Sequence, residues 1–269
     1  MTGQEKLTLW NILQTVEKSL PGFNSLLTLQ NQPFFQDDIQ VSSQKTQNEN
    51  PVNKEDFISS GNSQNISASD ENFSNKDKVL LQIKQKIASC KNCILCKTRS
   101  NTVPGTGVTN PLVLVIGEGP GFEEDMSGQP FVGNAGKLLD KMLASIQLSR
   151  TKNCFITNVV KCRPPQNRNP YPEEMDACNA YLLAQISVLK PKLILCVGSV
   201  ASQKLLSSSY GVTKLRGSFY ETLNIPVAVT YHPSALLRDN SLKAYAWQDL
   251  KMVREKLLEL EPDYQTQNQ

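Results

Sequence analysis

Short apolar runs rich in β-branched residues alternate with longer helical stretches from residue 79 onward, and this alternation constrains the fold more than any other feature. The expected strands are 112–116, 154–159, 193–197 and 227–230. The expected helices are 79–88, 135–146, 173–189, 200–207 and 244–260. Such alternation predicts a mainly parallel sheet with helices on both faces. We therefore expect an α/β chain with three α/β/α layers and a central four-stranded sheet, with an extra hairpin around 214–223.

The first 78 residues have a different composition. Residues 4–20 fit a short amphipathic helix, because apolar residues recur at helical spacing and Pro21 and Gly22 end the run. Residues 36–78 are mostly Gln, Asn, Ser and charged side chains, which predicts a disordered linker. The expected domains are thus an N-terminal peptide (1–35), a linker (36–78) and a folded domain (79–269). The N-terminal helix is a candidate docking segment for a protein partner.

Charge is unevenly distributed along the chain. Residues 1–78 hold 6 Lys/Arg and 10 Asp/Glu, whereas residues 79–269 hold 22 and 15, a net charge of +7. A basic folded domain suits contact with phosphates, although a surface tuned for solubility would look the same. The apolar runs are too short to span a bilayer, and the N-terminus is too polar for a signal peptide. We expect a soluble, cytoplasmic monomer that does not associate with membranes.

Four of the seven cysteines have the spacing of a metal site. Cys90 and Cys93 form a C-x2-C pair directly after an expected helix, and Cys162 and Cys178 form a second pair 16 positions apart. A C-x2-C turn brings two thiolates to one centre, and a distant pair completes four-coordination when the chain folds back. An odd number of cysteines in an intracellular chain also argues against a disulfide framework. The spacing leaves zinc and an iron–sulfur cluster both open.

The other three cysteines have different surroundings. Cys96 is close enough to the first pair to compete for a place in the centre. Cys154 and Cys196 lie inside apolar strand runs, which predicts that they are small core residues.

Distinctive residues follow the expected strands, at the edge where ligands bind in such sheets. The segment 117–121, GEGPG, lacks the ending of a phosphate loop and the spacing of a dinucleotide fingerprint, which argues against a nucleotide cofactor. Phe131, in a loop bounded by Gly and Pro, could stack on a base, and Asn158 could read a base edge. Loop packing and turn capping are the alternative interpretations of these two residues.

The only histidine, His232, directly follows the last expected strand. Leu236, Leu237 and Arg238 come next, in a segment that we expect to be exposed. Apolar side chains beside an arginine suit a loop that enters DNA and holds a phosphate.

Four stretches together resemble the family-4 uracil-DNA glycosylases, which are iron–sulfur enzymes. They are CKNCILCKTR, GEGPGFEEDMSGQPFVGNAGKLLDKML, ITNVVKCRPPQNRNPYPEEMDAC and HPSALLR, in that order within roughly residues 88–258. The resemblance implies the α/β/α uracil-DNA glycosylase fold and DNA containing uracil as the substrate. It also implies a [4Fe–4S] cluster of structural rather than redox function, with zinc the weaker alternative. Its implied ligands are Cys90, Cys93, Cys162 and Cys178.

The resemblance also assigns roles around the base. It implies that Phe131 stacks on uracil, that Asn158 reads its polar edge and that the backbone of Glu118 and Gly119 lines the pocket. His232 would support the departing uracil anion while water completes hydrolysis of the N-glycosidic bond, the first step of base excision repair.

Three roles are assigned with less guidance from the family. Its better-known family-1 relatives have Asp where this chain has Gly119, so Glu124 is our candidate for positioning water. Leu236 is the candidate wedge that displaces the base, and Arg238 the candidate phosphate contact. Two other functions stay open: a non-enzymatic DNA-binding module with a structural metal, and a related glycosylase that prefers hypoxanthine or mismatched bases.

Overall fold

The structure is a computed structural model that describes residues 74–265. The expected N-terminal peptide (1–35) and residues 36–73 of the expected linker lie outside the described residues. The linker prediction is wrong for its last residues, because helix α2 begins at Asn75. Ser74 accepts a hydrogen bond from the Asp77 N–H, and the Asp77 carboxylate accepts one from the Ser74 N–H. This reciprocal capping box starts the helix within a polar sequence.

The described residues form a six-stranded sheet with the order β1-β3-β2-β4-β6-β5. Four central strands are parallel, as predicted, but an antiparallel strand is added at each edge, so the expectation of four strands is wrong. The strands are β1 (Thr106–Gly107), β2 (Val113–Gly117), β3 (Cys154–Asn158), β4 (Leu193–Val197), β5 (Phe219–Thr222) and β6 (Ile225–Thr230).

The two edge strands explain the difference from the sequence prediction. β1 has only two residues, too few to show any periodicity. The expected hairpin lies further along the chain, because Val212–Leu215 forms helix α7 and β5 pairs with β6 instead. Leu223 and Asn224 join these strands with φ of 51° and 58°, the left-handed values that a tight two-residue hairpin turn uses.

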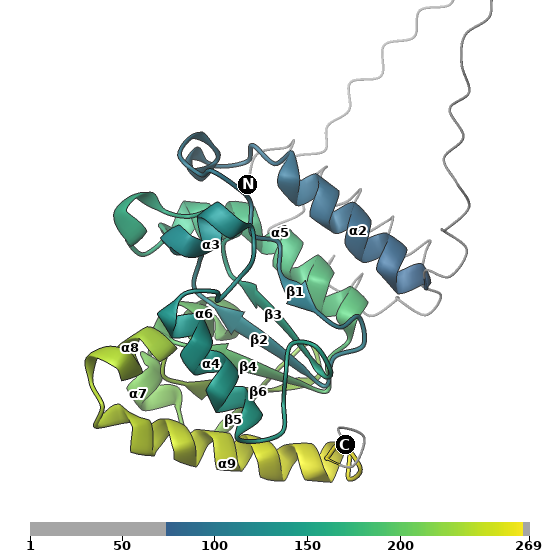
Figure 1. The fold of residues 1–269 in the computed structure, drawn as a ribbon, viewed down its shortest axis with the longest axis vertical. Helices are drawn as coiled ribbons and strands as arrows, with labels where there is room; N and C mark the ends of the chain where they lie inside the picture. Colours follow the sequence, from purple (N-terminus) through teal and green to yellow (C-terminus); the bar gives the residue numbers. More distant parts are fainter. Residues whose placement is uncertain (1–73, 266–269) are drawn as a thin grey trace, which may run out of the picture.

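Helices cover both faces of the sheet, which confirms the three-layer expectation. Figure 1 shows α2 lying alongside α5 on one side, and α4 and α9 on the other. The α-helices are α2 (Asn75–Ala88), α3 (Phe122–Ser127), α4 (Asn134–Ala144), α5 (Pro172–Leu189), α6 (Ser199–Leu206), α7 (Val212–Leu215), α8 (Pro233–Arg238) and α9 (Leu242–Leu260). Two short 3-10 helices are η3 (Ile94–Lys97) and η4 (Pro165–Asn167).

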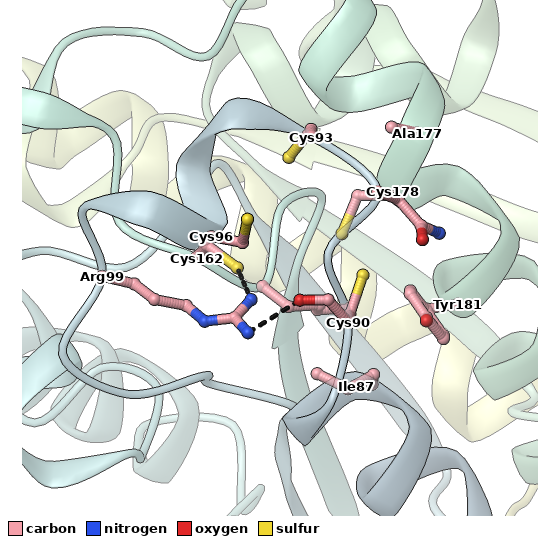
Figure 2. Close-up of a pocket in the computed structure, with 11 residues that line it drawn as sticks. Ile87, Cys90, Cys93, Cys96, Arg99, Cys162, Ala177, Cys178 and Tyr181 are labelled. Atoms are coloured by element: carbon pink, nitrogen blue, oxygen red, sulfur yellow. Dashed lines mark hydrogen bonds between the residues drawn. The ribbon is translucent and has the colours of Figure 1, made fainter.

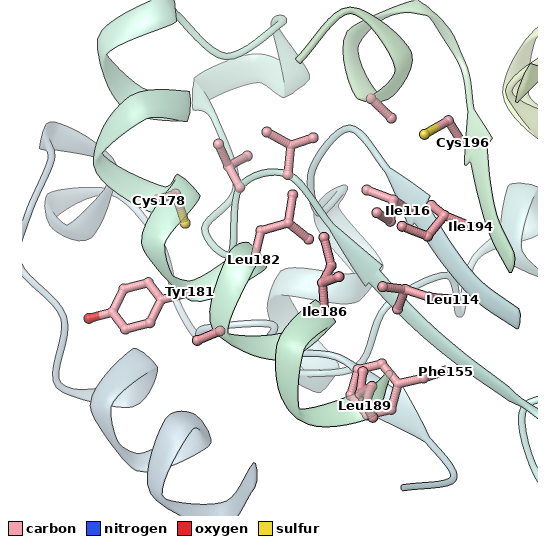
Figure 3. Packing of buried hydrophobic residues seen from close by; sticks show 14 of the residues in the cluster. Leu114, Ile116, Phe155, Cys178, Tyr181, Leu182, Ile186, Leu189, Ile194 and Cys196 are labelled. Carbon is pink, nitrogen blue, oxygen red and sulfur yellow. The ribbon is translucent and has the colours of Figure 1, made fainter. Parts of the chain in front are cut away.

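Each face of the sheet has its own hydrophobic core. Leu114 and Ile116 of β2 pack toward α2 and α5, whereas Val113 and Val115 pack toward α4 and α9. Figure 3 shows the first core, where side chains of α5 such as Leu182 meet the strands. Burial on both faces explains why the central strands are continuous apolar runs.

Cys154 and Cys196 are fully buried in these cores, as predicted. Within residues 74–265, no helix has the length and apolar character needed to cross a membrane.

Candidate active site

Three expected site residues come together at the carboxyl edge of the parallel strands. Gly117 ends β2 and pairs with Asn158, which ends β3. A Cβ atom added to Gly117 would lie 2.5 Å from Asn158 Oδ1 and 2.5 Å from Phe131 Cζ. The absence of a side chain at Gly117 therefore lets the Phe131 ring and the Asn158 amide meet above the end of the strand.

The third residue is His232, which follows β6 and caps helix α8. The ring centroids of His232 and Phe131 are 5.5 Å apart, with an angle of 32° between the ring planes. Phe131 itself is held at φ 54°, in the left-handed region that bulky residues seldom adopt. Backbone strain of this kind concentrates at binding sites, where the surrounding structure holds the residue in place.

Asn158 carries an unused acceptor at the base of this arrangement. Its side chain is buried, and among residues 74–265 its Oδ1 atom has no hydrogen-bond partner. A buried oxygen without a donor costs about 1–3 kcal/mol. The turn-capping interpretation would have given Oδ1 a backbone donor nearby, so a ligand N–H is the better account of this atom.

The protonation of His232 follows from its contacts. Its Nδ1 atom accepts a hydrogen bond from the Ser234 N–H at 3.2 Å and lies 2.8 Å from Ser234 Oγ. The pKa of His232 is lowered to about 4, mainly by burial and also by the positive charge of Arg238, while Glu124 acts in the opposite direction. The ring is therefore neutral at physiological pH and, with Nδ1 accepting, carries its proton on Nε2. Such a ring is a hydrogen-bond donor, not a cation.

Glu124 has contacts that differ from those expected of a residue that positions water. Its Oε1 atom accepts from the N–H groups of Val132 (2.9 Å) and Gly133 (3.1 Å), and its Oε2 atom accepts from Gly121 (3.1 Å). The Oε1 atom thus holds the loop that follows Phe131, and the Oε2 atom holds the backbone at the start of α3. These contacts give Glu124 a positioning role, and they offer no support for the water-positioning role.

The backbone of Glu118 and Gly119 is held by the segment that follows β3. Glu118 O accepts from the Val160 N–H at 3.1 Å. A Cβ atom on Gly119 would lie 2.7 Å from Val160 Cγ2, so the family-1 Asp would require this packing to shift. Glu118 is half-buried, and burial raises the pKa of its carboxyl group.

The two leucines that follow His232 point to different sides of helix α8. Leu236 is only 1% exposed and packs in the core with α4 and α9, so the expectation that it is an exposed wedge is wrong. Leu237 is 48% exposed and Arg238 is also exposed, on the solvent side of the same helix. Successive residues of a helix point in directions about 100° apart, which is why one leucine is buried and the next is not.

The predicted metal ligands all line one pocket (Figure 2). Cys90 and Cys93 follow α2, Cys162 follows β3, and Cys178 belongs to α5. Cys96 of η3 lines the same pocket. In the described part of the chain, no three His, Cys, Asp or Glu side chains are arranged to hold a metal ion, so the identity of the centre is a matter for proposal.

The surroundings of the thiols favour an anionic centre. The Arg99 guanidinium donates to Cys162 Sγ at 2.9 Å and to Cys90 O at 2.8 Å (Figure 2). Lys161 also lines the pocket, whereas no carboxylate is among its lining residues. Burial raises the pKa of Cys93 to about 11 and that of Cys178 to about 12, so a bound metal must displace their protons. Thiolate ligands flanked by two cations fit an iron–sulfur cluster of net negative charge.

One structural residue was missed by the sequence reasoning. Asp125 of α3 is buried, and its carboxylate accepts from the N–H groups of Ser100 and Asn101, just after the first cysteine pair. It thereby ties the cysteine segment to the helix that follows the GEGPG turn. A carboxylate at the third position of the run EED gave no signal that distinguished it from its neighbours.

An aromatic ring, a buried amide and a neutral imidazole at the carboxyl edge of an α/β/α sheet are groups suited to holding a nucleobase. The family model of the uracil DNA glycosylase superfamily matches residues 104–251. The chain is 41% identical to the type-4 uracil-DNA glycosylase of Archaeoglobus fulgidus, over 64% of this chain and 90% of the relative. It is 43% identical to the type-4 uracil-DNA glycosylase of Sulfurisphaera tokodaii, over 65% of this chain and 84% of the relative. It is 38% identical to that of Thermotoga maritima, over 66% of this chain and 95% of the relative. The chain belongs to the type-4 uracil-DNA glycosylase family.

Proposed function

We propose that this protein removes uracil from DNA by hydrolysing its N-glycosidic bond. The observation that carries the proposal is the unpartnered Oδ1 atom of Asn158, buried beside Phe131 and near the neutral His232. The edge of uracil presents an N–H between two carbonyl oxygens. An asparagine amide matches this edge, because its oxygen accepts from the N–H and its NH₂ donates to a carbonyl.

The base must leave the duplex to reach this site. Its glycosidic carbon is shielded in the helix, so enzymes of this kind rotate the nucleotide into a pocket. Phe131 then provides a stacking surface, and the Glu124 carboxylate holds the loop that presents it. Leu237 replaces Leu236 as our candidate for the side chain that fills the vacated space, and Arg238 is the proposed phosphate contact.

His232 supports departure of the base. As the bond between C1′ and N1 breaks, the electron pair moves onto uracil, and negative charge develops on its carbonyl oxygens. The Nε2–H of neutral His232 donates to O2 and stabilises this charge. A positioned donor of this type contributes about 2.7–4 kcal/mol to the transition state. Water then supplies the hydroxyl group at C1′, and the uracil anion takes up the remaining proton.

We further propose a [4Fe–4S] cluster on Cys90, Cys93, Cys162 and Cys178, with Cys96 as a neighbour and not a ligand. When bound, the cluster would supply structural cross-linking, because the hydrolysis involves no net electron transfer. Its ligands would join the end of α2, the end of β3 and helix α5. The two cations beside the thiols and the all-thiolate donor set suit an anionic centre of either kind. Membership of the type-4 family supports the cluster over zinc.

A substrate panel tests the function. Purified, iron-loaded protein is incubated with matched duplexes containing U·G, U·A, hypoxanthine·T, T·G or normal pairs, and with single-stranded uracil DNA. We expect cleavage of the uracil substrates and loss of most activity in His232→Ala and Asn158→Ala. Iron, sulfide and zinc are measured on the same sample.

The alternatives predict other outcomes. Binding to every duplex without cleavage would establish a DNA-binding module, and preferred removal of hypoxanthine or of the mismatched thymine would establish the other glycosylase. An iron-loaded protein that cleaves no uracil substrate contradicts the proposal.

A further inference from the structure

Lys161 is a buried cation that the proposed mechanism does not use. It lies three residues after Asn158 and directly before Cys162, and its side chain is only 1% exposed. Its Nζ atom donates to Thr157 Oγ1 at 2.7 Å, to the backbone oxygen of Asn158 at 2.7 Å and to Gln185 Oε1 at 2.8 Å. A lysine ammonium has three N–H donors, and these three acceptors use all of them.

The two side chains that accept hydrogen bonds from Lys161 are themselves held by the backbone oxygen of Pro104. Gln185 Nε2 donates to Pro104 O at 2.6 Å, and Thr157 Oγ1 donates to the same oxygen at 3.1 Å. Both acceptor side chains are themselves buried. The ammonium therefore cannot shift without breaking contacts that join β3, α5 and the segment before β1.

Lys161 also lines the cysteine pocket. Cys162, a proposed cluster ligand, directly follows Lys161 in the chain, and Cys178 lines the same pocket. Lys161 therefore lines the pocket of the proposed cluster and also bonds the carbonyl group of the residue that reads the base.

Burying a charge is costly unless that charge is paired and hydrogen-bonded, and an apolar residue of similar volume often serves stability equally well. Stability alone is therefore a weak explanation for a lysine here. The hydrogen bond to Asn158 gives a better one, because it fixes the peptide from which the amide side chain extends.

We propose that Lys161 is a positioning residue that couples the cysteine centre to base recognition. The negative charge of the thiolate centre holds the ammonium group inside the protein, and the ammonium group holds the Asn158 backbone so that its amide faces the base. This inference rests on the proposed function, since it requires that Asn158 binds uracil.

The test replaces Lys161 with methionine, which keeps the length of the side chain and removes its charge and donors. Inhibition of uracil-DNA cleavage by free uracil is measured on the iron-loaded protein, because the inhibitor is the base alone and reports base recognition separately from contacts to the DNA backbone. We expect the Ki for uracil to rise about tenfold, as the loss of one hydrogen bond from a charged donor implies. Removal of a buried cation should also lower the reduction potential of the centre.

Tyr264→Phe is the matched control. Its hydroxyl group donates to Ile146 O at 3.2 Å in the core on the opposite face of the sheet. The control loses one buried hydrogen bond, as a general structural defect would, and both the Ki and the potential should stay at wild-type values. Equal Ki values for Lys161→Met, Tyr264→Phe and the wild type would overturn the proposal.

A double-mutant cycle separates action through Asn158 from a general effect. In the Asn158→Ala background, Lys161→Met should change the Ki by less than about twofold, because contacting residues of one network are not additive. In the His232→Ala background, Lys161→Met should keep its full effect. A full effect in both backgrounds refutes positioning through Asn158.

A milder variant covers the case in which Lys161→Met does not retain iron. Thr157→Val removes one of the three acceptors and keeps the cation, so we expect normal iron content and a smaller rise in the Ki. An unchanged Ki in this variant then overturns the proposal. Failure of the proposed function would be seen separately, as a wild-type protein that neither cleaves uracil DNA nor is inhibited by uracil.

Discussion

Replacement of Glu124 distinguishes two roles of its carboxylate, which are to hold the backbone around Phe131 or to position the attacking water. Glu124→Ala removes the acceptor of three backbone N–H groups, those of Gly121, Val132 and Gly133. A hydrogen bond to a charged group contributes about 1.5–3 kcal/mol. The carboxylate is half-buried, so water can reach the exposed amides, and we expect the three bonds together to be worth about 2–4 kcal/mol.

Two of the three bonds, those to Val132 and Gly133, hold the loop that presents Phe131, so most of this loss should fall on that loop. Base binding then requires the loop to be ordered again, so the Ki for uracil and the KM for uracil DNA should both rise, by about tenfold or more. Amide hydrogen exchange at Val132 and Gly133 should accelerate. Glu124→Gln keeps one carbonyl oxygen and should lie between the wild type and Glu124→Ala. Glu123→Ala removes the adjacent exposed carboxylate and serves as the control.

A residue that positions water would behave differently. Its loss would lower kcat and leave uracil inhibition, KM and amide exchange unchanged, because the base pocket would stay intact. That pattern in Glu124→Ala would refute the bracing role and restore the water-positioning interpretation of the sequence.

Three further predictions concern the imidazole, the cysteines and helix α8. Because the pKa of His232 is lowered to about 4, kcat/KM should show no inflection from this group between about pH 5 and 8. The unfolded chain takes up the proton first, so as pH falls from the ordinary value of 6.5 toward 4 the melting temperature should fall, and His232→Ala should reduce this dependence. Cys96→Ser should keep the visible absorbance and iron content, whereas Cys162→Ala should lose both and melt at a lower temperature. Leu237→Ala should weaken uracil excision without changing the melting temperature, whereas Leu236→Ala should cost about 2–5 kcal/mol in unfolding free energy, measured by urea denaturation.

The central sheet could be predicted because its strands are buried on both faces. That burial makes each strand a continuous apolar run, and the residues directly after β3 and β6 then mark the carboxyl edge. Asn158 and His232 were found in this way, since each lies at or just beyond a strand end. The spacing of the cysteines predicted that the two pairs would come together, and they line one pocket. The spacing did not exclude Cys96, and the choice of four ligands came from the family resemblance.

The rest depends on contacts that no local pattern encodes. The bond from Glu124 to the Val132 amide joins residues eight positions apart in an irregular loop. Leu236 and Leu237 are adjacent residues of the same type, so the sequence does not distinguish them. The orientation of α8 against the core decides which of the two is exposed. Lys161 did leave a signal, a charged residue directly after an apolar strand and before a cysteine, but its partners are distant in sequence.

The end of β3 places the proposed base-reading amide, the buried cation and a proposed cluster ligand within five consecutive residues, Asn158 to Cys162. A slip of one residue in strand register turns each side chain to the opposite face, so these groups are correctly placed together or misplaced together. Under the proposed function, the cluster content of a protein sample should therefore indicate the fraction of molecules with a correctly formed active site. The ratio of visible to ultraviolet absorbance should count competent active sites, and specific activity should scale with that ratio from batch to batch.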